Sequence, residues 1–384
     1  MSASEQISRI RAANIKHVLK VSIHYGEWVM RHREFVLVQV ELSSGQVGHA
    51  YGLTREGPVR EIIERSIATS YLGKSIDDPE AAFYSALWSN HAVHAAGIGM
   101  RALSLVDLAT WDALARVKGQ SIGDLIAPSH VARDLPATAI VGYPPSTSPE
   151  ETVEMVLRLQ TQGWSRFKIP ISPDAELSIA RLEAVREAAP EVWLGFDINM
   201  VMRTAEEVLA FEKRVRHLSL GWIEDLVPPG DPHAVAAVRT GGMTPVAMGD
   251  EQGGSYYPQS LLDAHAVDFL RVDATTNGGL TGLRKVVAQA RASGVAIAPH
   301  MFPHTHARLM SALGIDAPVE WGVPGTGVHP MDDGLERPVI ENGLMKPMSN
   351  DVGFGQLVDL PWILQQELDD PSGLVHDVES VVAS

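Results

Sequence analysis

The stretch Trp193-Leu-Gly-Phe-Asp197 is the first of three short apolar runs that each end in a carboxylate. The next two are Gly221-Trp-Ile-Glu224 and Pro245-Val-Ala-Met-Gly-Asp250. Successive carboxylates lie about 26 residues apart, close to the roughly 25 residues that one strand, one helix and two loops occupy in a barrel of alternating strands and helices. The spacing therefore predicts consecutive strands of such a barrel, each ending in an acidic residue.

The series continues along the chain with Asp273, His300 and Glu320, which also end or interrupt short apolar runs. Continuous apolar runs are typical of buried parallel strands. We expect strands at 137–143, 166–171, 193–199, 221–226, 245–250, 269–274, 296–301 and 319–321. Between them we expect amphipathic helices, among them 151–162, 175–189, 204–218 and 280–293. This is a (β/α)7β barrel, a modified TIM barrel of the α/β class. An open doubly wound sheet is the alternative, but the Gly-rich dinucleotide fingerprint is absent and polar residues end six consecutive strands.

The first 130 residues show a different pattern. Residues 15–23 and 35–41 alternate like antiparallel strands, and residues 45–48 suggest a turn. Residues 61–72 and 92–117 are predicted to be helical. We therefore expect an α+β capping domain at 1–130, a catalytic barrel at 131–344 and a C-terminal segment, 345–384, that packs back onto the cap.

The composition narrows the class of protein. The chain has 384 residues, 45% of them hydrophobic, which is ordinary for a globular protein. Its formal net charge of −16 argues against nucleic acids or an anionic membrane as partners. The absence of Cys excludes disulfides and thiolate chemistry. Since no signal-type or membrane-spanning run is present, we expect a cytoplasmic enzyme that acts on a small molecule and forms a homo-oligomer.

The barrel pattern brings the strand ends to one mouth, where active sites of such barrels lie. Three carboxylates meeting there, Asp197, Glu224 and Asp250, repel one another unless a cation joins them. Hard oxygen ligands favour Mg²⁺. Asn199 adds a second oxygen group two residues after Asp197, on the same side of the strand.

Two further pairs of residues suggest proton chemistry. Asp273 and His300 end neighbouring strands, so the carboxylate can orient the imidazole and stabilise its charged form. His300 is then a candidate general base or acid. Lys168, inside the apolar run Arg166–Pro170, either extends its head to the barrel mouth or binds an anionic substrate. Glu320, on the last strand, either acts on the substrate or pairs with Lys168.

Several segments resemble the mandelate racemase branch of the enolase superfamily, and the resemblance covers nearly the whole chain. They are 102–112 at the end of the cap, Trp222-Ile-Glu-Asp-Leu-Val-Pro-Pro229, Asp273-Ala-Thr-Thr-Asn-Gly-Gly279, Ala298-Pro-His300 and Gly353-Phe-Gly355. The resemblance implies that Asp197, Glu224 and Asp250 bind Mg²⁺ and that Asp273 and His300 form the catalytic dyad. It implies that Glu320 hydrogen-bonds the enolate oxygen. The reaction that it implies begins with removal of the proton α to a carboxylate, with Mg²⁺ stabilising the ene-diolate.

One position departs from the family pattern. The racemases carry Lys-x-Lys on the second strand, whereas this chain has Lys168-Ile-Pro170. A two-base racemisation is therefore disfavoured. One-base chemistry remains: His300 removes the α-proton and its protonated form assists loss of the β-hydroxyl. That predicts an acid sugar dehydratase, a hydro-lyase that makes a 2-keto-3-deoxy acid.

The resemblance also places two specificity loops in the cap. His24, Tyr25, Tyr51 and Arg55 are candidates to bind distal hydroxyls or a second carboxylate of the substrate. Two other functions stay open. One is a racemase or epimerase with an additional base such as Tyr257. The other is a metal-binding barrel without catalysis, although a binding module has no need of an oriented base.

Overall fold

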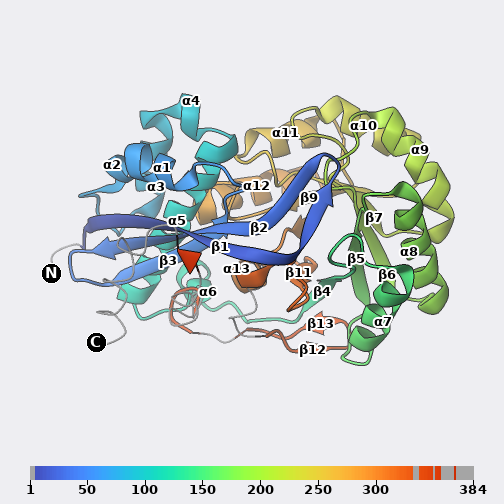
Figure 1. The fold of residues 1–384 in the computed structure, drawn as a ribbon. Coiled ribbons are helices and arrows are strands. Elements are labelled where there is room, and N and C mark those ends of the chain that lie inside the picture. The colour runs from blue at the N-terminus through green and yellow to red at the C-terminus, as the bar shows by residue number, and fades with distance from the viewer. Residues whose placement is uncertain (1–4, 332–336, 349–350, 356–366, 369–384) are drawn as a thin grey trace.

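Eight parallel strands and their helices form one part of the protein, and a cap made of helices and an antiparallel sheet lies beside them (Figure 1). The computed structural model describes residues 5–331, 337–348, 351–355 and 367–368. The central strands are β4 (Leu135–Ile140), β5 (Arg166–Pro170), β6 (Trp193–Asp197), β7 (Trp222–Glu224), β8 (Val246–Met248), β9 (Phe269–Val272), β10 (Ala296–Pro299) and β11 (Val319–Gly322).

These strands follow one another in spatial order from β4 to β10, and β11 pairs in parallel with β4. The last strand also contacts β10, so the described strands close into a barrel. The helices between them are α7 (Pro149–Gln160), α8 (Ala175–Ala188), α9 (Ala205–Val215), α10 (Pro232–Gly241), α11 (Tyr256–Asp263), α12 (Gly279–Ala292) and α13 (Pro303–Ala312). The predicted (β/α)7β architecture is confirmed.

Local sequence explains where several of these helices begin. Ser148 and Glu151 form a reciprocal capping box at the start of α7. The Thr204 and Asp231 side chains accept backbone N–H groups at the starts of α9 and α10. After α9 the chain makes a short 3₁₀ turn, Arg216–Leu218, which is the end of the helix predicted at 204–218.

The cap consists of an antiparallel sheet and a set of helices. The sheet has the order β14-β1-β2-β3, with β1 at Ile7–Tyr25, β2 at Trp28–Leu42, β3 at Val47–Leu53 and β14 at Glu367–Leu368. The helices are α1 (Val59–Ile62), a π-helical turn (Ile63–Ile67), α2 (Ala68–Tyr71), α3 (Pro79–Ser89), α4 (His91–His94), α5 (Gly97–Val117) and α6 (Ile122–Ile126). None of the described helices is both long and apolar enough to cross a bilayer.

Helix α5 packs directly on the cap sheet. Gly48 makes this approach possible, because a Cβ there would lie 2.2 Å from the carbonyl oxygen of Ala109. The helix predicted at 92–117 is interrupted before Gly97, whose φ of +58° and N–H bond to the Gln252 carbonyl (2.7 Å) start α5 against a barrel loop. That contact is tertiary, so the local pattern did not indicate the break.

The tail returns to the cap, as β14 pairs with β1 and Phe354 donates its backbone N–H to Asp112. The short strands β12 (Ile340–Glu341) and β13 (Leu344–Met345) extend the barrel sheet at the start of β4. We propose that the cap ends at residue 130, between α6 and β4, and that the barrel ends at residue 344, the first residue of β13.

The β1–β2 hairpin runs from the cap across to the barrel (Figure 1). Gly26, with a φ of +59°, makes its turn. Next to this turn, Tyr25 lines a cavity together with residues from the carboxyl ends of the barrel strands. The hairpin and the barrel mouth thus enclose one shared space.

Candidate active site

Asp197 and Glu224 end adjacent strands and lie opposite each other in the β6–β7 register. With Asp225 they form a group whose nearest ligand atoms lie within 4.8 Å of one another. Asp250 instead groups with Glu251 and His300 by the same measure. The three acidic residues predicted to bind one metal therefore fall into two neighbouring groups at the barrel mouth.

Lys168 lies between the acidic side chains. Its Nζ is 2.6 Å from Glu224 Oε1, 2.6 Å from Glu320 Oε1 and 3.6 Å from Asp197 Oδ2. Burial disfavours the charged amine, but these carboxylates outweigh burial and raise the pKa of Lys168. Lys168 is therefore a fixed cation in the floor of the cavity, and of the two roles considered for Glu320 the structure shows the pairing with it.

A second buried cation, Arg271, was not predicted. It lies on β9 two residues before Asp273, with Nη2 2.9 Å from Glu320 Oε2 and 3.5 Å from Glu224 Oε1. Burial raises the pKa of the Glu320 carboxyl, but together Arg271 and Lys168 lower this pKa by more than burial raises it, so the net shift is downward. A signal was present in the sequence, because an Arg inside the apolar run Phe269–Val272 is as unusual as Lys168 in its own strand.

His300 and Asp273 form the predicted pair. His300 Nδ1 is 3.0 Å from Asp273 Oδ2 and 3.3 Å from Asp250 Oδ2. Burial alone would lower the pKa of His300, but Asp250 and Asp273 outweigh it and raise the pKa. Since Nδ1 is directed at carboxylates, Nε2 is the ring nitrogen left for the cavity that His300 lines.

His306 has a structural role beside this pair. Its Nε2 accepts the backbone N–H of Ala274 (3.0 Å), so its Nδ1 carries the proton that is donated to the Met301 carbonyl (2.6 Å). Burial lowers the pKa of His306, which keeps the ring neutral. The side chain thereby fixes the loops that follow β9 and β10.

The acidic residues fit a divalent cation. Glu224 Oε2 and Asp250 Oδ1 are buried and have no hydrogen-bond partner in the described part of the protein. Burial and the neighbouring carboxylates raise the pKa of Asp225 well above its usual value, and burial also raises those of Glu224 and Asp250. Buried, mutually repelling carboxylates with unused oxygens are the donor set that a hard cation stabilises.

Asn199 lies at the edge of the cavity. Its backbone N–H donates to Asp197 Oδ1 (2.8 Å), and its amide Nδ2 donates to the Asp197 carbonyl (3.3 Å). Its φ of +49° turns the chain sharply after β6. Asn199 and Asp197 both line the cavity, although β6 ends at Asp197 and Asn199 lies in the turn that follows.

The four predicted cap residues separate into two pairs. Tyr25 and Arg55 line the cavity. The Tyr25 hydroxyl shares a hydrogen bond with the Tyr143 hydroxyl, and the Arg55 guanidinium forms an ion pair with Glu251. His24 is exposed on the hairpin, and Tyr51 packs in an aromatic cluster with its ring centroid 5.5 Å from that of Phe302. Neither His24 nor Tyr51 is among the residues that line the cavity. The two expected loop positions are strand positions in the structure, since His24 lies near the end of β1 and Tyr51 lies within β3.

Candidates for a second base are also placed by the structure. Pro170 ends β5 opposite Asp197 and brings no ionisable group to that face. Tyr257 is buried on α11 and does not line the cavity. Tyr143, which follows β4, does line it, although burial raises its pKa well above the usual value and keeps the phenol protonated.

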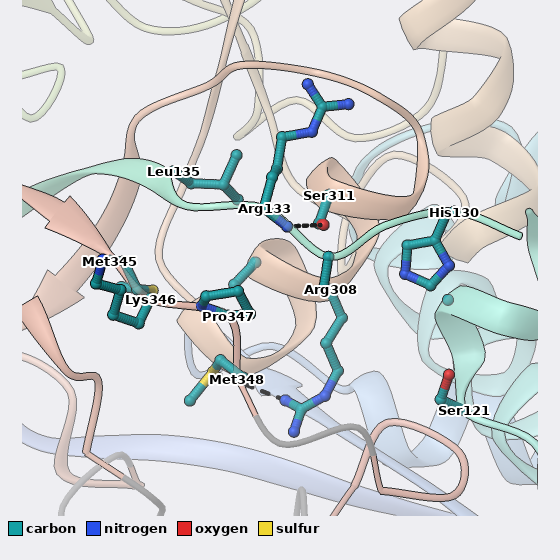
Figure 2. Close-up of a pocket in the computed structure, with 13 residues that line it drawn as sticks. Ser121, His130, Arg133, Leu135, Arg308, Ser311, Met345, Lys346, Pro347 and Met348 are labelled. Carbon is teal, nitrogen blue, oxygen red and sulfur yellow. Dashed lines mark hydrogen bonds between the residues drawn. The ribbon is translucent and has the colours of Figure 1, made fainter.

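The cavity between these residues, counted together with the solvent space at its opening, has an empty volume of about 430 Å³. A separate hollow lies near the amino end of the barrel (Figure 2). It is lined by Arg133, Leu135 and Arg308, together with Met345 of β13 and the three residues that follow it. Because Leu135 begins β4 while the carboxylates follow the ends of the strands, this hollow is at the other end of the barrel.

The sequence matches two known families over most of its length. Residues 151–361 match the family described as enolase C-terminal domain-like, and residues 10–127 match the mandelate racemase / muconate lactonizing enzyme N-terminal domain. The chain belongs to the mandelate racemase and muconate lactonizing enzyme family. The order of the two matches is the order of cap and barrel in the structure.

Curated relatives of the chain include a cycloisomerase and a dehydratase. The chain is 28% identical to D-galactarolactone cycloisomerase of Agrobacterium fabrum over 77% of this chain and 79% of that protein. It is 25% identical to L-talarate/galactarate dehydratase of Salmonella typhimurium over 70% of this chain and 68% of that protein.

Solved structures of the same fold superpose closely. L-talarate dehydratase from Polaromonas, complexed with Mg and L-glucarate, has a TM-score of 0.79, with 22% identity over 96% of both chains. A racemase from Streptomyces coelicolor with bound magnesium also has a TM-score of 0.79, with 20% identity over 91% of this chain and 96% of that one. At this identity the likeness establishes the fold.

Proposed function

We propose that this member of the mandelate racemase and muconate lactonizing enzyme family is a Mg²⁺-dependent acid sugar dehydratase. The observation that carries the proposal is the Asp273–His300 pair, 3.0 Å apart, on the wall of a cavity whose floor holds Lys168 and the acidic groups. The relatives named above act on sugar acids or their lactones, which supports the same substrate class here.

In this proposal Asp197, Glu224 and Asp250 hold Mg²⁺, with Asp225 close enough to assist. When bound, the ion supplies Lewis acid stabilisation of the negative charge that builds on the substrate carboxylate. Lys168 adds a fixed positive charge on the cavity floor, since its amine stays protonated. Both contributions are in place before the substrate arrives, so they cost little reorganisation.

His300 is the proposed base. Asp273 holds Nδ1 and so presents Nε2 to the proton α to the carboxylate. After abstraction, the imidazolium is stabilised by Asp273 and donates the same proton to the departing β-hydroxyl. Water leaves, the neutral imidazole is regenerated, and the enol product becomes a 2-keto-3-deoxy acid. One residue thus serves both steps on one face of the substrate.

A racemase or epimerase is the second candidate, because a cycloisomerase is among the relatives. It needs a base on the face opposite His300. Among the described residues that line the cavity, the candidates for this base are His329, Tyr143 and Lys168. The His329 ring packs edge-on against Phe35 and Phe302, burial keeps Tyr143 protonated, and Lys168 is held by two carboxylates. None of the three is as well prepared to accept a proton as His300, so dehydration is favoured.

The test compares wild type with His300→Asn on a panel of mono- and diacid sugars with Mg²⁺. Keto acids are detected as semicarbazones and α-proton exchange by NMR in D₂O. We expect the variant to bind Mg²⁺ but to lose both turnover and exchange. Exchange at the wild-type rate in the variant would place the base elsewhere, and tight binding without any turnover by wild type would favour a binding protein. Cytoplasmic location and a homo-oligomeric state stay predictions.

A further inference from the structure

Arg33 is a buried cation on the cap side of the cavity. It lies on β2, is only 5% exposed, and lines the same cavity as Lys168, Asp197 and His300. Within the described residues its side chain makes no hydrogen bond or ion pair, and its Nε is buried without a partner. A guanidinium whose Nε is buried and unpaired is costly without an anionic partner, so this position on the cavity wall favours an anion in the cavity.

The nearby carboxylates of the cap are already engaged. Glu34 accepts the Thr54 hydroxyl at 2.7 Å and lies 3.7 Å from Lys16 Nζ. Glu56 lies 3.5 Å from the ring of His32. These contacts leave Arg33 without a protein counter-ion in the described structure.

Arg55, one of the four cap residues expected to bind distal hydroxyls or a second carboxylate, is engaged as well. It pairs with Glu251, and the same carboxylate lies 3.1 Å from Arg101 Nη2. Two arginines therefore share one carboxylate. The cap side of the cavity carries excess positive charge, and Arg33 is its unpaired member.

The other end of the cavity is fitted for a different anionic group. Lys168 and the acidic residues that fit a cation lie in the barrel floor, where the reacting carboxylate is expected. A molecule that satisfied both ends would need two anionic groups, one at each end. The planar guanidinium fork matches a carboxylate in a bidentate geometry.

We propose that the substrate is a dicarboxylic sugar acid and that Arg33 binds its distal carboxylate. This inference rests on the proposed dehydratase function and narrows its substrate class. Arg55 lies beside this subsite and, through Glu251, connects it to the group that contains Asp250 and His300. Binding of the distal carboxylate by Arg33 would then help to hold the α-carbon opposite His300.

The experiment compares galactarate, a diacid, with galactonate, which differs in its distal group. We expect wild type to prefer the diacid by at least about 100-fold in kcat/KM, since a buried ionic partner left unpaired is strongly disfavoured. Arg33→Met should lower kcat/KM on the diacid by about 100-fold or more, and on the monoacid by only a few-fold. Arg33→Lys should recover only part of the loss, because an ammonium cannot bind in the bidentate mode.

Arg31→Met is the matched control, since Arg31 is exposed on the same strand and does not line the cavity. Its preference for the diacid should be that of wild type. Equal losses on both acids in Arg33→Met, or a wild-type preference for the monoacid, would overturn the proposal. So would a preference for a 6-phosphoaldonate over the diacid, because the distal group would then be a phosphate.

A binding measurement separates this proposal from the dehydratase assignment. Calorimetry of galactarate with the His300→Asn protein and Mg²⁺ requires no turnover. Adding Arg33→Met to that protein should weaken binding of the diacid by about 100-fold. If wild type dehydrates monoacids only, the diacid proposal alone fails. If the diacid binds through Arg33 but no sugar acid is turned over, the dehydratase assignment alone fails.

Discussion

Replacing Arg181 by Met should destabilise the protein strongly, although no carboxylate pairs with it among the described residues. Arg181 lies on α8 and is completely buried. Its guanidinium donates to the carbonyls of Gly142 (2.6 Å), Pro145 (3.0 Å) and Pro170 (3.2 Å), and to two hydroxyls. The residue thus joins the loop after β4 to the end of β5.

The magnitude follows from the groups left behind. Met keeps the length of the side chain but leaves three buried carbonyls without a donor, each costing about 1–3 kcal/mol. Because removing the buried guanidinium relieves its own desolvation, we expect a net loss of roughly 3–6 kcal/mol. With an unfolding entropy of about 2.1 cal/mol/K per residue over 384 residues, the melting temperature should fall by about 4–7 °C.

Arg186→Met is the control. Arg186 lies on the same helix and donates to four backbone carbonyls, but it is partly exposed. Water can replace its hydrogen bonds, so the loss should stay below about 1.5 kcal/mol, or about 2 °C. The assay is thermal unfolding of both variants by circular dichroism under one set of conditions. Equal shifts in the two variants would refute the reasoning from burial.

Three further predictions concern the site. Asp273→Asn removes a carboxylate that raises the pKa of His300, so the pKa of this imidazole should fall in the variant. Because the neutral ring is the active form, the acid limb of the pH profile of kcat/KM and the NMR titration of the imidazole should both move to lower pH. Mg²⁺ at about 100 times its dissociation constant should stabilise wild type by about 2.7 kcal/mol, and Glu224→Gln should abolish that gain in a thermal shift assay. Pro170→Lys should not produce an efficient racemase, because the shell around that position is not built to hold a base. NMR in D₂O with both C2 epimers of an accepted acid checks this, and equilibration of the epimers by wild type without keto acid would favour the isomerase.

The periodic features of this protein could be predicted from the sequence. Each barrel strand is a short apolar run, and each active-site end carries a polar residue such as Asp197, Glu224 or His300. Strand period and connection length are local properties, so they fix which residues reach the barrel mouth. The same reasoning paired Asp273 with His300, because consecutive parallel strands are neighbours in the sheet.

The contacts between the cap and the barrel were decided only by the tertiary structure. Arg33 lies in a strand whose residues alternate between the two faces of the sheet, and none of its neighbours in sequence indicates that its side chain becomes a buried cation facing the barrel. His24 and Tyr51 are a second example, because they were expected in loops over the site but lie in β1 and β3, where the hairpin leaves His24 exposed and the aromatic cluster holds Tyr51. Side-chain direction at a domain junction depends on both partners, and neither partner's sequence contains it alone.

The pairing of charged groups in the site could also be found only from the tertiary structure. The sequence supplied the acidic residues and Lys168, but only the packed barrel shows that Arg271 meets Glu320 at 2.9 Å and that Asp250 groups with His300. Electrostatic interactions depend on distance and on burial, and both are set when the eight strands close. The sequence therefore determined which groups reach the mouth, and the fold determined which of them interact.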